Sequence, residues 1–223
     1  MSCPYETQLL SAWQAAPNQG SHSAPDCAPD SAHDLAHIRR VWANCEALAR
    51  ESTPAPDMEL LRAAAVLHDL VSLPKDAPDR ASASRLSAEA AAPLALKAGL
   101  PAQKIPALKH AILAHSFSAN VAPQTVEAKI LQDADRLDAL GAIGLARLFL
   151  VSGALNRPLY DPDDPAAQTR APDDSRFALD HLYTKLFKLA QTMQTPEGRA
   201  LAEARSAYMR SFLAQLLAEA RSV

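Results

Sequence analysis

Apolar residues recur at the spacing of an α-helix through most of this 223-residue chain, and this pattern limits the fold more than any other feature. In the run AHDLAHIRRVWANCEALARES they return every third or fourth residue, at Leu35, Ile38, Val41, Trp42, Cys45 and Leu48. Alanine and leucine dominate, only 6 residues are glycine, and no long run of Val, Ile and Thr alternates with period two. We therefore predict an all-α protein.

Proline-rich and polar stretches divide the chain into expected helices over residues 6–16, 32–52, 58–70, 81–99, 101–117, 125–155, 174–193 and 195–222. Asp57 and Thr195 precede two of them as N-caps, and Gly99 ends a third. The long run 125–155 is expected to bend near Gly141 and Gly144. As domains we expect residues 1–30 to form a helix and a Pro/Ser-rich loop, and residues 31–223 to form a helical domain with a C-terminal helical extension.

Composition and charge exclude several classes of protein. The formal net charge of -3 gives no reason to expect nucleic-acid binding. No uninterrupted apolar run reaches the length of about 18 residues that a membrane helix needs, and the start MSCPYETQLLSAW lacks the basic and apolar parts of a signal peptide. The 3 scattered cysteines look like reduced thiols. We expect a cytoplasmic protein.

The doublet His68-Asp69 stands inside the apolar run LRAAAVLHDLVSLPKD. Neighbours on a helix point about 100° apart, so at least one of the two side chains reaches the interior or a cleft. A buried carboxylate without a partner costs several kcal/mol, and a divalent metal with imidazole and carboxylate ligands removes that cost. Taken alone, the doublet fits equally a core histidine with a satisfied hydrogen bond beside a helix-end carboxylate.

Two further expected helices carry ligand-type residues at the border of an apolar face. His37 lies one turn after His33 and beside Ile38, and Asp135 lies one turn before Asp138 in a run of Ile, Leu and Ala. Helical proteins build metal centres from ligands that converge from facing helices. The combination therefore favours a metal centre over separate structural roles.

The order His…His-Asp…Asp on helices resembles the HD-domain metal-dependent phosphohydrolases. The segments AHDLAHIRRV, LLRAAAVLHDLVSLPK, ILAHSFS and ILQDADRLDALGAIGLAR are similar to the YedJ-type bacterial members, and the similarity extends over roughly residues 31–215. This resemblance implies an HD-type helical bundle with additional C-terminal helices. It also implies the metal ligands His37, His68, Asp69 and Asp135, with His68 and Asp69 as the catalytic doublet.

Four other residues are candidates for substrate binding: His33, Lys75, Arg80 and His115. His33 shares a helix face with His37. It would contact substrate, bind a second metal, or simply be a polar residue at the helix end. Lys75 and Arg80 follow the doublet in the LPKDAPDR loop, where a cation would neutralise phosphate charge, although a solvated loop is the alternative.

His110 and His115 are ~140° apart on a helix, so they cannot both face one metal, and His115 lies nearer the helix end. Asp138, on the face of Asp135, could orient a ligand or a water molecule. Asp133 is two residues from Asp135, so it points away from the face of Asp135, and we expect it to be a surface or capping carboxylate. Lys75 or His115 would protonate the leaving oxygen.

Imidazole and carboxylate ligands suit Mn, Fe, Co, Ni or Zn, and Mg less well. A bound divalent ion lowers the pKa of water from ~15.7 toward ~7, so hydroxide is available at neutral pH. The resemblance implies hydrolysis of a phosphate ester or anhydride in a nucleotide or related phosphometabolite.

Two other functions stay open at this point. One is a non-catalytic, nucleotide-sensing helical module that retains the metal site. The other is a metal-dependent oxygenase, which needs two irons and more histidines than the spacing provides. Leu and Phe residues on the last expected helix would pair with a second subunit, giving a homodimer, or pack on the chain's own core.

Overall fold

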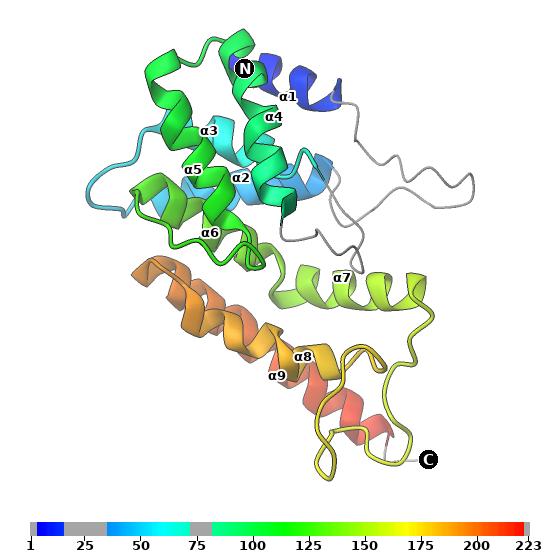
Figure 1. Ribbon diagram of the computed structural model, residues 1–223. Helices are drawn as coiled ribbons and strands as arrows, with labels where there is room; N and C mark the ends of the chain where they lie inside the picture. The colour runs from blue at the N-terminus through cyan, green and yellow to red at the C-terminus, as the bar shows by residue number, and fades with distance from the viewer. Residues whose placement is uncertain (1–3, 16–34, 72–81, 221–223) are drawn as a thin grey trace. The chain divides into compact units, whose positions relative to one another are not determined.

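The computed structural model describes residues 4–15, 35–71 and 82–220 (Figure 1). Every regular element in these ranges is a helix, which confirms the predicted all-α class. Their bounds are α1 Pro4–Gln14, α2 Leu35–Ala49, α3 Met58–Leu67, α4 Ala83–Ala98, η2 Ala102–Lys104, α5 Ile105–His115, α6 Val126–Asp138, α7 Gly141–Ala154, α8 Asp180–Thr184, η3 Leu186–Thr192 and α9 Pro196–Ala220, where η marks a 3₁₀-helix.

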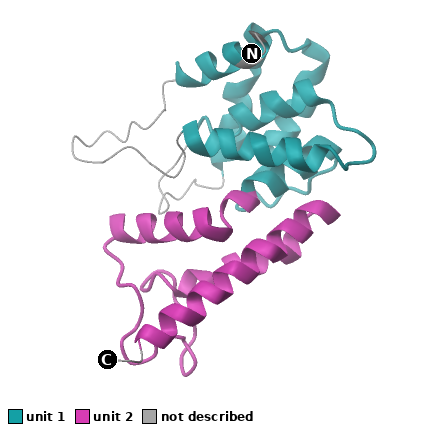
Figure 2. Ribbon diagram, turned by 180° about the vertical axis from the view of Figure 1, so that it is seen from behind, with its two compact units in different colours: residues 1–135 teal, residues 136–223 magenta. Residues whose placement is uncertain are grey.

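The chain forms two compact units, residues 1–135 and residues 136–223 (Figure 2). Helix α6 runs through the boundary between them, so that its last three residues belong to the second unit. The domain boundary expected between residues 30 and 31 lies outside the described residues and stays a prediction.

Helix α3 is the centre of the first unit, where it packs against α1, α2, α4 and α5. Its apolar residues are buried on all sides, in the run Leu60, Leu61, Ala63, Ala64, Ala65, Val66 and Leu67. Small alanines in this run let neighbouring helices approach closely. The end of α3, where the His-Asp doublet follows, is therefore held by packing from several directions.

Side-chain hydrogen bonds join α6 to the other helices of this unit. Asn44 on α2 donates to the carbonyl of Ala134 at 3.1 Å, and the amide of Gln132 donates to the carbonyl of Ala114 on α5 at 2.6 Å. Glu127 accepts from the backbone N–H of Asp57, just before α3, at 2.8 Å. These bonds hold α6 beside α2, the start of α3 and the end of α5.

The expected helix caps are present. Asp57 accepts from the backbone N–H groups of Glu59 and Leu60, each at 3.1 Å, and begins α3. Gly99 ends α4 with φ of 105°, in the left-handed region that glycine adopts most easily. Thr195 accepts from the backbone N–H of Gly198 at 3.0 Å and begins α9.

In the second unit, the prediction of one helix over residues 174–193 is wrong. The segment contains the short α8 and the 3₁₀-helix η3, and the backbone leaves helical geometry at Lys185 (φ −131°, ψ −60°). Asp180, the fully buried first residue of α8, accepts from Arg170 and, at 2.6 Å, from the backbone N–H of Asp173. These bonds hold residues 170–180 in a loop.

Helices α6 and α7 meet at a bend of 65°, which confirms the expected break near Gly141. No single helix in the described ranges is long and apolar enough to cross a membrane. The bent pair α6–α7 meets that criterion by length and composition only.

Candidate metal centre

The doublet lies where α3 ends. His68 keeps helical angles (φ −65°, ψ −30°) directly after Leu67, and its side chain is fully buried. Its Nδ1 lies 2.9 Å from the carbonyl oxygen of Ala65, which can only accept, so Nδ1 carries the proton and donates. The lone pair of Nε2 is therefore directed away from α3, as a ligand atom must be.

Helices α2 and α6 bring two residues to His68. The Nε2 atoms of His37 and His68 are 3.3 Å apart, and Oδ1 of Asp135 lies 3.6 Å from the first and 3.9 Å from the second. These three ligand atoms, from three different helices or helix ends, lie within 4.8 Å of one another. Both histidines are fully buried, and Asp135 is 30% exposed.

Helix α5 brings His115 to the same ring. Nε2 of His115 lies 4.0 Å from Oδ1 of Asp69, and the rings of His68 and His115 meet edge to face with centroids 4.8 Å apart. Nδ1 of His115 donates to the carbonyl of Ile112, so this Nε2 also presents a lone pair. His68, Asp69 and His115 thus form a second group of three ligand atoms within 4.8 Å.

This donor set fits a divalent metal. Around His68 lie imidazole nitrogens and carboxylate oxygens, the ligand types of Zn²⁺, Mn²⁺ and related ions. Two buried imidazole nitrogens 3.3 Å apart need a proton or a cation between them, because two lone pairs repel. The carboxylate of Asp135 beside them supplies the negative charge that a cation requires.

The cluster also shifts the ionisation of its members. Burial lowers the pKa of His115 below its ordinary value, and the nearby His68 lowers it further, against the charges of Asp135 and Asp69. Burial would raise the pKa of Asp135, but its electrostatic interactions with the imidazoles of His68, His115 and His37 outweigh burial and hold that pKa below its ordinary value. The neutral imidazole of His115 and the ionised carboxylate of Asp135 are the forms that bind metals.

The four expected ligands therefore occur in two overlapping groups that share His68, with Asp69 in the group of His115. Sequence reasoning assigned His115 to substrate and did not place it among ligand-type atoms. The signal was its place at the end of an apolar helix, but only the packing of α5 on α3 reveals its partner. His33, Lys75 and Arg80 lie outside the described residues, and their roles stay predictions.

Other candidates lie elsewhere. Asp138 forms an ion pair with Arg147, and His110 accepts from the backbone N–H of Gln124 at 3.0 Å. The prediction of Asp133 as a surface or capping carboxylate is wrong, because its side chain is fully buried. Helix α6 is covered on more than one face, so pointing away from Asp135 does not mean pointing to solvent.

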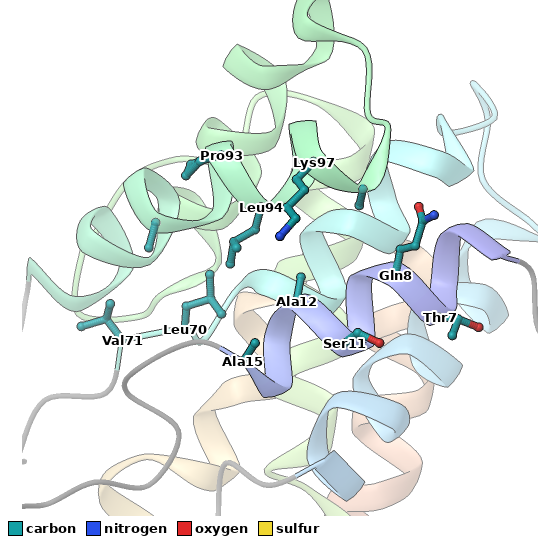
Figure 3. Close-up of a pocket in the computed structure, with 12 residues that line it drawn as sticks. Thr7, Gln8, Ser11, Ala12, Ala15, Leu70, Val71, Pro93, Leu94 and Lys97 are labelled. Atoms are coloured by element: carbon teal, nitrogen blue, oxygen red, sulfur yellow. The ribbon is translucent and has the colours of Figure 1, made fainter.

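A pocket with a volume of about 680 Å³ lies between α1 and α4 in the first unit. Figure 3 shows Leu70 and Val71, which follow the doublet in the chain, at one end, and Lys97 beside Leu94. Its walls are mostly aliphatic, and none of the ligand-type residues described above lines it. The groups of metal-ligand type lie in the polar cluster at His68 and not in this pocket.

The fold and the site together define the class of this protein. It is an all-α protein in which packed helices surround a cluster of histidine and aspartate side chains of metal-ligand type. The HD domain family model matches residues 34–140, and the chain belongs to the HD-domain family. This confirms the resemblance to HD-domain proteins, and the similarity to the YedJ-type members stays a prediction.

Relatives extend over most of the chain. YpgQ of Bacillus subtilis (strain 168), an uncharacterized protein, is 34% identical over 190 residues, which is 83% of each protein. The crystal structure of Bacillus subtilis YpgQ in complex with ADP matches with a TM-score of 0.68 and 27% identity, over 97% of each chain. An HD-superfamily hydrolase from Bacillus thuringiensis matches with a TM-score of 0.70 and 28% identity, over 98% of this chain and 100% of that one.

Proposed function

We propose that this protein is a metal-dependent phosphohydrolase that cleaves a phosphate ester or anhydride in a nucleotide or a related phosphometabolite. The observation that carries the proposal is the convergence of buried imidazoles and carboxylates on His68. Membership of a family with hydrolase relatives supports it, and the ADP bound by YpgQ supports a nucleotide as substrate.

The proposed ligands are His37, His68, Asp69 and Asp135. Hydrogen bonding of Nδ1 to Ala65 fixes the ring orientation of His68 and directs Nε2 to the cluster. Asp135 stays ionised because its electrostatic interactions with the imidazoles around it lower its pKa. When bound, a divalent ion supplies a hydroxide nucleophile at neutral pH and polarises the phosphoryl group.

His115 is the proposed contact for the phosphoryl group, since its Nε2 lies 4.0 Å from Oδ1 of Asp69 and its ring meets that of His68 edge to face. Once protonated, it would also donate that proton to the leaving oxygen. His33, Lys75 and Arg80 are proposed to contact the same substrate through its phosphate charge. Burial of the two central histidines keeps bulk water from their ring nitrogens, which strengthens every charge interaction there.

A nucleotide-sensing module is the second candidate, because a relative holds ADP. Such a protein would keep the metal and bind a nucleotide without turning it over. Measuring hydrolysis of the nucleotide distinguishes the phosphohydrolase from the sensing module, whereas measuring nucleotide binding does not.

The first prediction concerns metal content. Purified protein should contain a transition metal, and His68→Ala should lose it, because His68 belongs to both groups of ligand atoms. Elemental analysis of wild type, His68→Ala, Asp135→Asn and the control His110→Ala, a histidine of α5 outside the cluster, tests this. Equal metal in all four proteins would refute the proposed site.

Activity is then measured with the metal-loaded wild type. Nucleoside mono-, di- and triphosphates are incubated with Mn²⁺, Co²⁺, Ni²⁺, Zn²⁺ or Mg²⁺, and released phosphate and pyrophosphate are measured. We expect release with at least one pair of metal and nucleotide, abolished in Asp69→Asn and kept in His110→Ala. Nucleotide binding with no release across the whole panel would support the sensing module instead.

A further inference from the structure

Asp135 lies in the last turn of α6, which ends at Asp138. The backbone N–H groups of Ala139 and Leu140 close this turn on the carbonyls of Arg136 and Leu137, each at 3.1 Å. A turn at a helix end frays unless other groups also hold it. A ligand in such a turn has a defined position only where the turn itself is held. Helix α6 therefore needs an anchor at its end.

Arg205 of α9 provides one contact. Its Nη1 donates to the carbonyl of Leu137 at 2.5 Å, two residues after Asp135. A cation that binds the last carbonyls also interacts favourably with the negative end of the helix dipole. The aliphatic part of Arg205 packs over Gly141, where an added Cβ would lie 3.3 Å from its Cγ.

Arg147 of α7 provides a second contact, an ion pair with Asp138. Asp138 is 1% exposed, so this pair is shielded from solvent and from salt. Both arginines act on the last two residues of α6, from two different helices of the second unit.

Glycines make the corner between α6 and α7 tight enough for these contacts. Gly141 has φ of 73°, a conformation that other residues adopt with strain. At Gly144 an added Cβ would lie 2.2 Å from the carbonyl oxygen of Ala139, closer than real atoms come. The corner thus brings α7 directly against the end of α6.

We propose that Arg205 and Arg147 are positioning residues that hold the last turn of α6 and thereby fix Asp135 for metal binding. The affinity of the metal centre then depends on two residues of the second unit, of which Arg205 is about 70 positions away from Asp135 in the sequence. This inference rests on the proposed metal centre, and it adds to it residues that no ligand pattern includes.

The test uses the full-length protein and two measurements. Hydrogen exchange of the metal-free protein reports how firmly the last turn of α6 is held, and titration calorimetry with Mn²⁺ gives the metal affinity. Arg205→Ala should exchange faster at residues 135–140 while α3 keeps its protection, and should bind Mn²⁺ about 10-fold or more weakly, as removal of outer ligand support does. Arg205→Lys should restore part of both.

Arg199→Ala is the matched control, because Arg199 is also on α9 and donates to a backbone carbonyl, that of Met193 at 3.3 Å, away from α6. It should leave the Mn²⁺ affinity unchanged. If Arg205→Ala disturbs the whole fold, Arg205→Gln, which keeps the aliphatic stem, replaces it.

Unchanged Mn²⁺ affinity in Arg205→Ala would overturn the inference, and so would faster exchange spread equally over α3 and α6 with no loss of affinity. Failure of the proposed function looks different. Wild type and all variants would then bind no metal, while exchange in the metal-free protein would still show whether Arg205 holds α6.

Discussion

His68 has a different neighbour on each edge of its ring. Its Nδ1 is committed to the carbonyl of Ala65, its Nε2 faces His37 and Asp135, and His115 meets it edge to face. A buried histidine with one satisfied nitrogen needs a partner for the other, since an unpaired buried polar atom costs about 1–3 kcal/mol. The neighbours of Nε2 are ligand-type atoms, which is why a cation fits there better than a structural hydrogen bond alone.

His115 allows a sharp prediction at the residue scale. If it contacts the phosphoryl group, His115→Ala should keep the metal content of wild type and lose turnover by about 10²–10⁴-fold, the usual size of a general acid–base contribution. Elemental analysis and single-turnover kinetics of the same preparation measure both quantities. Loss of one metal ion per chain in His115→Ala would instead make His115 a metal ligand.

Residue-level reasoning from the sequence selected members of this cluster where their chemistry alone made them visible, and their roles stay predictions. The doublet is visible because two polar residues interrupt an apolar run, and His37 and Asp135 lie at the border of apolar faces. Asp133 was assigned wrongly to the surface. Helix periodicity predicts the direction in which a side chain points, but not whether another part of the protein covers it. The place of His115 beside Asp69 depends on how α5 packs on α3, which no local pattern encodes.

At the scale of elements, a cap and two ion pairs hold the start of α3, the helix that the doublet follows. Asp57 caps α3 and also pairs with Lys104 at 2.7 Å, and Lys104 reaches Glu59 at 2.6 Å. Burial would raise the pKa of Asp57, but the hydrogen bonds from Lys104 and from the backbone of Leu60 and Glu59 outweigh it and lower that pKa. The ionised form is therefore the one that the folded protein favours.

We expect Asp57→Ala to lower the free energy of unfolding by about 0.5–2 kcal/mol, the usual value of an N-cap. Asp57→Asn keeps the cap and loses the charge, so its loss should be smaller. Because the folded pKa lies below the unfolded one of ~3.9, the charge-dependent part is present above that pH and disappears as the pH falls through the folded pKa.

Urea unfolding of the three proteins at pH 7 and pH 3 measures this. The difference between wild type and Asp57→Asn should shrink at the lower pH. A difference that is the same at both pH values would show that the pair with Lys104 does not stabilise α3.

Elements with local signals were predicted well, and those with distant causes were not. Caps at Asp57, Gly99 and Thr195 follow from neighbouring residues, as does the bend at Gly141. The segment 174–193 has the composition of a helix, yet the bonds between Arg170 and the buried Asp180 hold the preceding loop in place. Such a contact forms only after the chain has folded back on itself.

At the scale of the whole chain, two units share the helix that carries Asp135. The Leu and Phe residues of the last helix pack at least partly within the second unit, where Phe212 meets the ring of Phe149 at 5.9 Å and Leu213 is buried. The homodimer expected from these residues stays a prediction. Two solved structures match over nearly the full length of this chain, so both units have counterparts in these relatives.

The last prediction concerns metal removal from the whole protein. A metal bound to residues of α2, α6 and the end of α3 joins elements that are far apart in the sequence, and it binds the folded state alone. At a free metal concentration 100 times the dissociation constant, this adds about 2.7 kcal/mol to the stability. For a chain of this size the melting temperature should rise by roughly 5–11 °C, at about 2–4 °C per kcal/mol.

The measurement is a thermal melt of protein treated with EDTA, before and after titration with Mn²⁺ or Co²⁺, for wild type, His68→Ala and the control His110→Ala. His110→Ala should behave like wild type because His110 lies outside the cluster. His68→Ala should show no increase, because loss of this ring removes a ligand atom from both groups at once. An equal increase in His68→Ala and wild type would place the metal at another site in the chain, and the argument for hydrolysis at the His-Asp doublet would fail with it.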